Sequence, residues 1–128
     1  MVSIDKISEK IAAFGIPGLI FLVAYGLTGL AGAAAITAAL AAIGPGGIIG
    51  GIVSLFAIGL LSEEIAKYGF KALSKGVVKA LIEKGETKES IINTINTKYK
   101  FISKDLKLYI KDLVDSYDEK ESENGEKQ

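Results

Sequence analysis

The chain has 128 residues, with 15 lysines balanced by 15 acidic residues, and 49% of its residues are hydrophobic. It contains no Cys, His, Trp or Arg, which excludes disulfides, thiolate metal sites and nucleophiles activated by histidine. We therefore expect no enzymatic activity, no metal and no cofactor, and the absence of arginine argues against nucleic-acid binding.

The distribution of charge is the strongest signal in the chain. None of the 52 residues between Lys10 and Glu63 carries a charge. A single helix of that length would extend about 80 Å, more than twice the roughly 30 Å hydrocarbon thickness of a bilayer. The run therefore predicts a membrane protein in which this segment folds back on itself. The expected fold class is all-α: a membrane helical hairpin of two spans, then a basic amphipathic helix and a short cytoplasmic helical segment.

Residues 1–15 are predicted to form an amphipathic N-terminal helix. Its apolar side chains recur at helical spacing at Ile4, Ile7, Ile11 and Phe14. Gly15 is typical of a helix end and Pro17 of the first turn of the next helix. The pattern fits either a helix lying at the lipid surface or a cytoplasmic segment that leads into the first span.

Residues 16–62 are predicted to form the transmembrane hairpin. The first span, Pro17–Ile43, is about 40 Å long as a helix, so it must tilt, kink or break. The glycines and proline of residues 44–47 are the strongest turn signal in the sequence. The second helix runs from about Ile48 to Leu61.

Small residues recur every four positions in both predicted spans. These candidate packing residues are Gly29, Ala33, Thr37 and Ala41 in the first span and Gly46, Gly47, Gly50 and Gly51 around the second. Small residues four apart let two helix backbones approach closely in lipid. They fit packing within one hairpin and also association between chains, so we expect a homo-oligomer.

Residues 63–117 are predicted to form a juxtamembrane basic helix followed by cytoplasmic helices. In the first of these, 63–84, one side carries the lysines Lys67, Lys71, Lys75 and Lys79, and another side is apolar. A basic amphipathic helix beside a span is expected to lie on the anionic lipid headgroups of the bilayer. The alternative is a helix of an ordinary bundle whose lysines face water.

Two more helices are predicted after Gly85, which is typical of a helix stop. Thr87 is expected to cap the first and Ser103 to begin the second. The apolar positions of the last helix fit either a small bundle or a short coiled-coil seam; they are Ile102, Leu106, Tyr109, Leu113 and Tyr117. The charged tail, residues 118–128, has no apolar anchor and is expected to be disordered.

Two glycine-rich stretches resemble a known family. Residues 26–32 (GLTGLAG) and 43–47 (IGPGG) are similar to segments of the interferon-alpha-inducible 6-16 family of small Gly/Ala-rich membrane proteins. Leu27 stands where that family has Phe, and Pro45 interrupts the glycine run. The resemblance implies a helical membrane protein linked to organelle-membrane integrity, cell death or defence. It carries over no functional residues.

These features together predict a small self-associating integral membrane protein that alters membrane permeability, as a holin-like or defence effector pore would. The alternative is a membrane anchor or adaptor whose helices in 63–117 bind a partner protein. Five lysines against one acid between Lys67 and Lys84 predict that this flank is cytoplasmic. With two spans, both termini are then expected on the cytoplasmic side.

Overall fold

The computed structural model describes residues 4–27, 67–99 and 102–127, and of 118–127 it describes the backbone alone. In these parts of the chain it has five helices and no strand, as the sequence predicted. The helices are α1 (Ile4–Ala12), α2 (Ile16–Leu27), α6 (Phe70–Glu83), α7 (Lys88–Lys98) and α8 (Lys104–Lys127). The predicted hairpin turn at 44–47 and most of the two spans lie outside the described residues.

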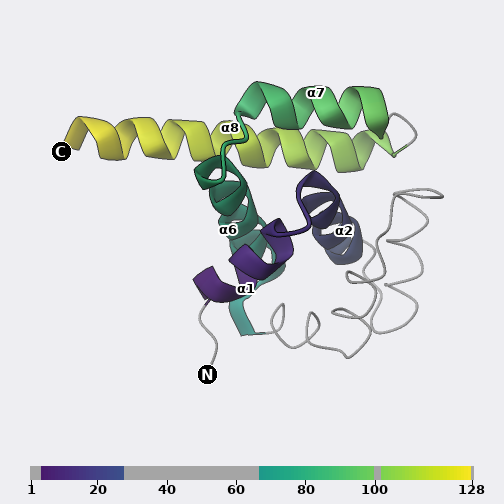
Figure 1. Cartoon of the computed structure of the whole chain (residues 1–128), viewed down its shortest axis with the longest axis horizontal. Coiled ribbons are helices and arrows are strands. Elements are labelled where there is room, and N and C mark those ends of the chain that lie inside the picture. The colour runs from purple at the N-terminus through teal and green to yellow at the C-terminus, as the bar shows by residue number, and fades with distance from the viewer. Residues whose placement is uncertain (1–3, 28–66, 100–101, 128) are drawn as a thin grey trace.

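The described helices form a bundle built around α2 and α6 (Figure 1). α6 packs against α1, α2 and α8, and α2 also packs against α8 and α1. α7 lies antiparallel along the first half of α8, and the C-terminal half of α8 extends past the bundle (Figure 1). Among the described helices, α1, α6 and α8 thus pack against α2.

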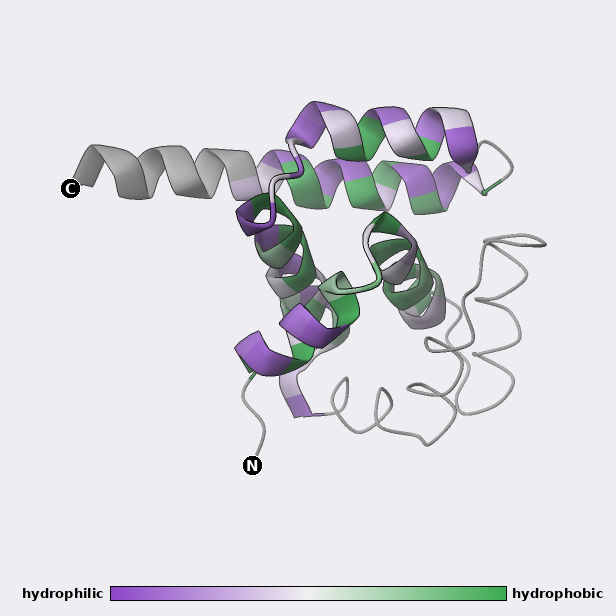
Figure 2. Ribbon diagram, viewed as in Figure 1, coloured by the Kyte–Doolittle hydropathy of each residue, from purple (hydrophilic) through white to green (hydrophobic). Residues whose placement is uncertain are grey.

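α2 is buried around its whole circumference. Five successive residues, Leu19–Val23, each have 0% of their surface exposed. Because an α-helix has 3.6 residues per turn, five residues in a row cover every side of it. The ribbon of α2 is hydrophobic all round, whereas α1, α7 and α8 each show a hydrophilic side (Figure 2). A helix without a polar face must be covered either by protein or by lipid.

α1 and α2 meet at a sharp corner, as Gly15 and Pro17 predicted. Gly15 has φ 76°, a conformation that glycine adopts without a steric penalty, and Pro17 lies in the first turn of α2. No single helix among the described residues is long and apolar enough to cross a membrane. α1 and α2 together have the length and hydropathy of a span, but they are bent by 119°.

The helix predicted over 63–84 is interrupted at Gly69. Residues 67 and 68 are helical, Gly69 has φ 83°, and α6 begins only at Phe70. The helical spacing of apolar residues across this position concealed the break. The local reason for it is the glycine, which is poorly suited to a helix interior and free to take positive φ.

The junction between α6 and α7 is closed by two helix-capping motifs. Gly85 has φ 112°, the Glu86 N–H donates to the Leu81 carbonyl at 3.0 Å, and the Gly85 N–H donates to that of Ile82 at 3.0 Å. These are the two bonds of a Schellman motif. Thr87 then caps α7: its hydroxyl accepts from the Ser90 N–H, and its own N–H donates to the Ser90 hydroxyl. The predicted stop at Gly85 and cap at Thr87 are confirmed.

α8 begins as predicted and ends later than predicted. The Leu106 N–H donates to the Ser103 hydroxyl at 3.2 Å, which makes Ser103 the cap. The buried residues of α8 face the same chain's bundle rather than a coiled-coil seam; they are Leu106, Ile110, Leu113 and Val114. The tail expected to be disordered is instead helical to Lys127. Glutamate and lysine, which dominate this segment, are good helix formers even without apolar anchors.

The corner between α1 and α2 yields a stability prediction at Gly18. A Cβ atom there would lie 2.3 Å from the Ile11 carbonyl oxygen, which is backbone and cannot rotate away. Gly18→Ala should therefore lower the free energy of unfolding by about 1–3 kcal/mol, although alanine is the better helix former. The measurement is thermal unfolding in mild detergent, followed by circular dichroism.

Gly76→Ala is the matched control, because its Cβ would first meet the Ser8 hydroxyl, a side-chain atom that can turn aside. It should lower the free energy of unfolding by less than Gly18→Ala does. Equal losses in the two variants would show that the backbone contact at Ile11 has no special weight.

Candidate functional site on the lysine surfaces of α6 and α8

The structure keeps three of the four predicted lipid-facing lysines on one helix. Lys71 and Lys79 are exposed and Lys75 is half-buried, all on α6. Lys67 is exposed but lies before the break at Gly69, with its Nζ 5.2 Å from the centroid of the Tyr68 ring. The continuous stripe of four lysines predicted from the sequence is therefore divided at Gly69.

The apolar side of α6 is covered by protein. Leu73, Val77 and Val78 have 0% exposure and Leu81 has 1%, and α6 contacts α1, α2 and α8. An interfacial helix binds lipid mainly through its exposed apolar area, which α6 does not have in this arrangement. In the structure, α6 is therefore one helix of a bundle. Contact between its lysines and lipid stays a prediction.

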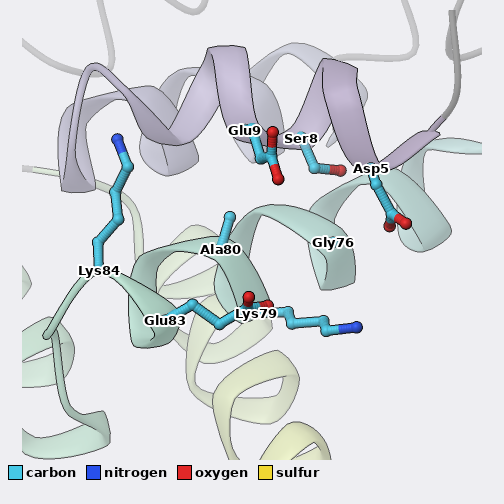
Figure 3. Close-up of a pocket in the computed structure, with 8 residues that line it drawn as sticks. All are labelled: Asp5, Ser8, Glu9, Gly76, Lys79, Ala80, Glu83 and Lys84. Carbon is cyan, nitrogen blue, oxygen red and sulfur yellow. The ribbon is translucent and has the colours of Figure 1, made fainter.

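A groove of about 380 Å³ lies between α1 and α6. Its lining residues are Asp5, Ser8, Glu9, Gly76, Lys79, Ala80, Glu83 and Lys84 (Figure 3). Three carboxylates therefore accompany two ammonium groups, so the charge of Lys79 is offset by acids of α1 and of its own helix. No group of His, Cys, Asp or Glu within the described ranges could hold a metal ion.

The floor of this groove is a close contact between Ser8 and Gly76. Ser8 is 2% exposed, and a Cβ atom on Gly76 would lie 2.3 Å from its hydroxyl oxygen. Gly76 leaves room for the Ser8 hydroxyl where α1 crosses α6. Sequence reasoning missed the contact, although a glycine inside an amphipathic helix was its signal.

A second close contact joins α2, α6 and α8. A Cβ on Gly26 would lie 2.2 Å from the Phe70 ring, and that ring stacks on Tyr109 with centroids 5.2 Å apart. Burial raises the pKa of the Tyr109 phenol from its ordinary value of 10.0. The contact holds the last turn of α2 against the rest of the bundle.

A groove of about 210 Å³ lies between α7 and α8. Its lining residues are Ile92, Ile95, Asn96, Lys104, Lys107, Leu108 and Lys111, and no carboxylate is among them. Leu108 is 57% exposed, the most exposed large hydrophobic residue in the described ranges. Sequence reasoning missed this surface. Its signal was the spacing of three lysines at three and four residues, which places them on one side of a helix.

The predicted packing residues lie outside the described part of the chain. These residues are Gly29, Ala33, Thr37, Ala41, Gly46, Gly47, Gly50 and Gly51.

Comparison of the chain with known protein families, with characterised proteins and with solved structures gave no match.

The raised pKa of Tyr109 predicts a loss of stability in alkaline solution. The folded protein keeps the Tyr109 phenolic proton to higher pH than the unfolded chain does. The contribution of Tyr109 to the free energy of unfolding is therefore complete below about pH 10, and it is lost as the pH rises through the pKa of the folded state. Phe70→Ala should uncover the phenol and bring its pKa back toward the ordinary value. Ultraviolet titration of the tyrosines measures this directly.

Burial also raises the pKa of the Tyr99 phenol, so two phenols titrate late. Tyr109→Phe serves as the assignment control, because the part of the late titration that it removes belongs to Tyr109. If Phe70→Ala left that part in place, the Phe70 ring would not be what shields Tyr109 from water.

Proposed function

We propose that this protein is a small self-associating integral membrane protein that alters membrane permeability, in the manner of a holin or of a defence or cell-death effector pore. The supporting observation is the burial of α2. This helix lies near the start of the uncharged run, its side chains from Leu19 to Val23 have no exposed surface, and it packs against α1, α6 and α8, which carry charged residues. An apolar helix covered in this way is kept from water, yet it can exchange protein contacts for lipid with little loss, because lipid is equally apolar.

Release of α1 from α6 is the first step that would uncover α2, which then has to leave α6 and α8 as well. The corner at Gly15 has a conformation that only glycine adopts freely, so the angle between α1 and α2 can change there without strain in a side chain. In the membrane-inserted form, residues 16–62 form the hairpin and both termini stay cytoplasmic. The small-residue stripes then bring copies of the hairpin together.

The proposal agrees with the resemblance to the interferon-alpha-inducible 6-16 family, whose proteins are linked to membrane integrity and cell death. It involves no enzymatic step, no cofactor and no nucleic acid.

A disulfide between α1 and α6 tests the release step. The chain has no cysteine, and an ideal Cβ on Gly76 lies 3.1 Å from the Ser8 Cβ. Disulfides have about 3.5–4.5 Å between the two Cβ atoms, so a bond forms here once the two helices separate slightly. The oxidised Ser8→Cys/Gly76→Cys variant should release at least tenfold less dye from vesicles than its reduced form, since a covalent latch blocks the movement. Mass spectrometry verifies the cross-link.

The single variant Ser8→Cys, oxidised in the same way, is the control and should leak like the parent. Unimpeded leakage from the cross-linked protein would rule out release of α1. A parent protein that leaves vesicles intact would refute the permeability proposal itself.

The glycine stripe of the second predicted span gives an independent prediction. Replacing Gly47 and Gly51 by Leu puts two bulky side chains on one face, one turn apart, and so separates the helices that meet there. The variant should form smaller oligomers in mild detergent and leak less dye. Exchanging Leu55 and Ile58 for other large apolar residues is the control. If the glycine variant assembles and leaks normally, the stripe serves at most packing within one chain.

A further inference from the structure

We propose that the α7–α8 groove binds the headgroup of an anionic membrane phospholipid. The inference rests on the proposed membrane association, but it does not depend on pore formation. It assigns the lipid contact to Lys104, Lys107 and Lys111 on α8, rather than to the lysines of α6 that the sequence singled out.

The charged side chains that line the groove are all lysines, and Lys107 also has a contact within the protein. Lys104 and Lys111 are exposed and Lys107 is half-buried, and all three line the same groove together with the amide side chain of Asn96. The Asp115 carboxylate is held by Lys88 at 2.7 Å. Lysine ammonium groups bind phosphate as point charges, so three on one side of a helix form a site for a phosphodiester.

The nearest other acids of α8 do not enter the groove. Asp105 and Asp112 are exposed, and neither is among the lining residues. At about 100° per residue, both fall on the side of α8 beyond Leu108, away from the three lysines. These two carboxylates border the lysine surface on one side but do not line the groove.

The rest of the groove is aliphatic, which points to an amphiphile rather than a free anion. Ile95 is 2% exposed, Ile92 is half-buried, and Leu108 stands 57% exposed at the edge. A phospholipid presents a phosphate to the lysines and hydrocarbon to Leu108, and so satisfies both kinds of lining. Inorganic phosphate would leave Leu108 in water.

The lysines of α6 provide a matched comparison. Lys79 shares its groove with Asp5, Glu9 and Glu83, whereas no carboxylate lines the α7–α8 groove. Two triple variants of equal charge change thus separate a specific site from general attraction: Lys104→Gln/Lys107→Gln/Lys111→Gln on α8 and Lys71→Gln/Lys75→Gln/Lys79→Gln on α6.

The experiment measures partition of the full chain onto neutral phosphatidylcholine vesicles and onto vesicles containing phosphatidylglycerol. One lysine near an anionic surface changes partition by roughly fivefold, so the α8 triple variant should lose at least about tenfold of the preference for anionic vesicles. The α6 triple variant should lose less than about threefold. High salt should reduce the preference of the parent protein, since it screens the attraction. Circular dichroism checks that both variants stay helical.

Leu108→Ser distinguishes a lipid from a free phosphate. It should weaken binding to anionic vesicles severalfold, and inorganic phosphate at millimolar concentration should not compete with those vesicles in the parent protein. Competition by inorganic phosphate, with no effect of Leu108→Ser, would overturn the assignment to a lipid.

Other outcomes would overturn the proposal in different ways. Equal losses of anionic preference in the two triple variants would show that the preference depends on net charge and not on a specific site. A synthetic acidic amphipathic peptide that binds through the three lysines of α8, and that anionic vesicles do not displace, would identify a protein partner instead. If the parent protein binds neither kind of vesicle, the proposed membrane association is refuted. If the α8 triple variant keeps the parent's preference for anionic vesicles, only the assignment of the site to the α7–α8 groove is refuted.

Discussion

α2 has no polar side, and the arrangement of the other described helices follows from the need to cover it. Full burial of a large apolar side chain contributes about 1.5–3 kcal/mol, so leaving one face of α2 in water would forgo much of the stability available to so small a bundle. α1, α6 and α8 each contribute an apolar side to this cover and keep a polar side outward. The bundle is therefore organised by one helix that could equally be solvated by lipid.

Close approach of the helices depends on glycines at the contact points. Gly18 lies against the Ile11 carbonyl, Gly26 against the Phe70 ring and Gly76 against the Ser8 hydroxyl. A glycine inside a helix is unfavourable by roughly 1 kcal/mol relative to alanine, and packing at short distance offsets that loss. The same use of small residues is predicted for the spans beyond Leu27, so the chain would employ one packing principle in protein and in lipid.

The two lysine-bearing grooves differ in their acids more than in their lysines. In the α1–α6 groove, the α1 carboxylates Asp5 and Glu9 line the same surface as Lys79. In the α7–α8 groove, three lysines line the same surface as aliphatic side chains, and the Asp115 carboxylate of α8 is bound by Lys88 of α7. The local field therefore depends on which helices become neighbours. Counting lysines along one helix cannot supply that information.

The sequence by itself determined the all-helical class and the ends of helices that are set locally. Gly15 with Pro17, Gly85 and Thr87 act through their own backbone conformations and through hydrogen bonds to residues a few positions away, so each could be identified from neighbouring residues. The break at Gly69 had the same kind of local signal, but helical spacing continued across it. The helical tail after Tyr117 showed that a lack of apolar anchors does not by itself prevent a helix.

Only the tertiary structure decided what covers each apolar face. The periodicity indicates that Leu73, Val77 and Leu81 share one side of a helix. A lipid surface or a neighbouring helix could cover that side equally well. The structure places α1, α2 and α8 there. Likewise, the side chains of Lys104, Lys107 and Lys111 line a groove only because α7 folds back along α8. α7 contributes Ile92 and Asn96 to the other side of that groove. Burial and charge at such positions are properties of pairs of helices far apart in sequence, and for this reason no single segment reveals them.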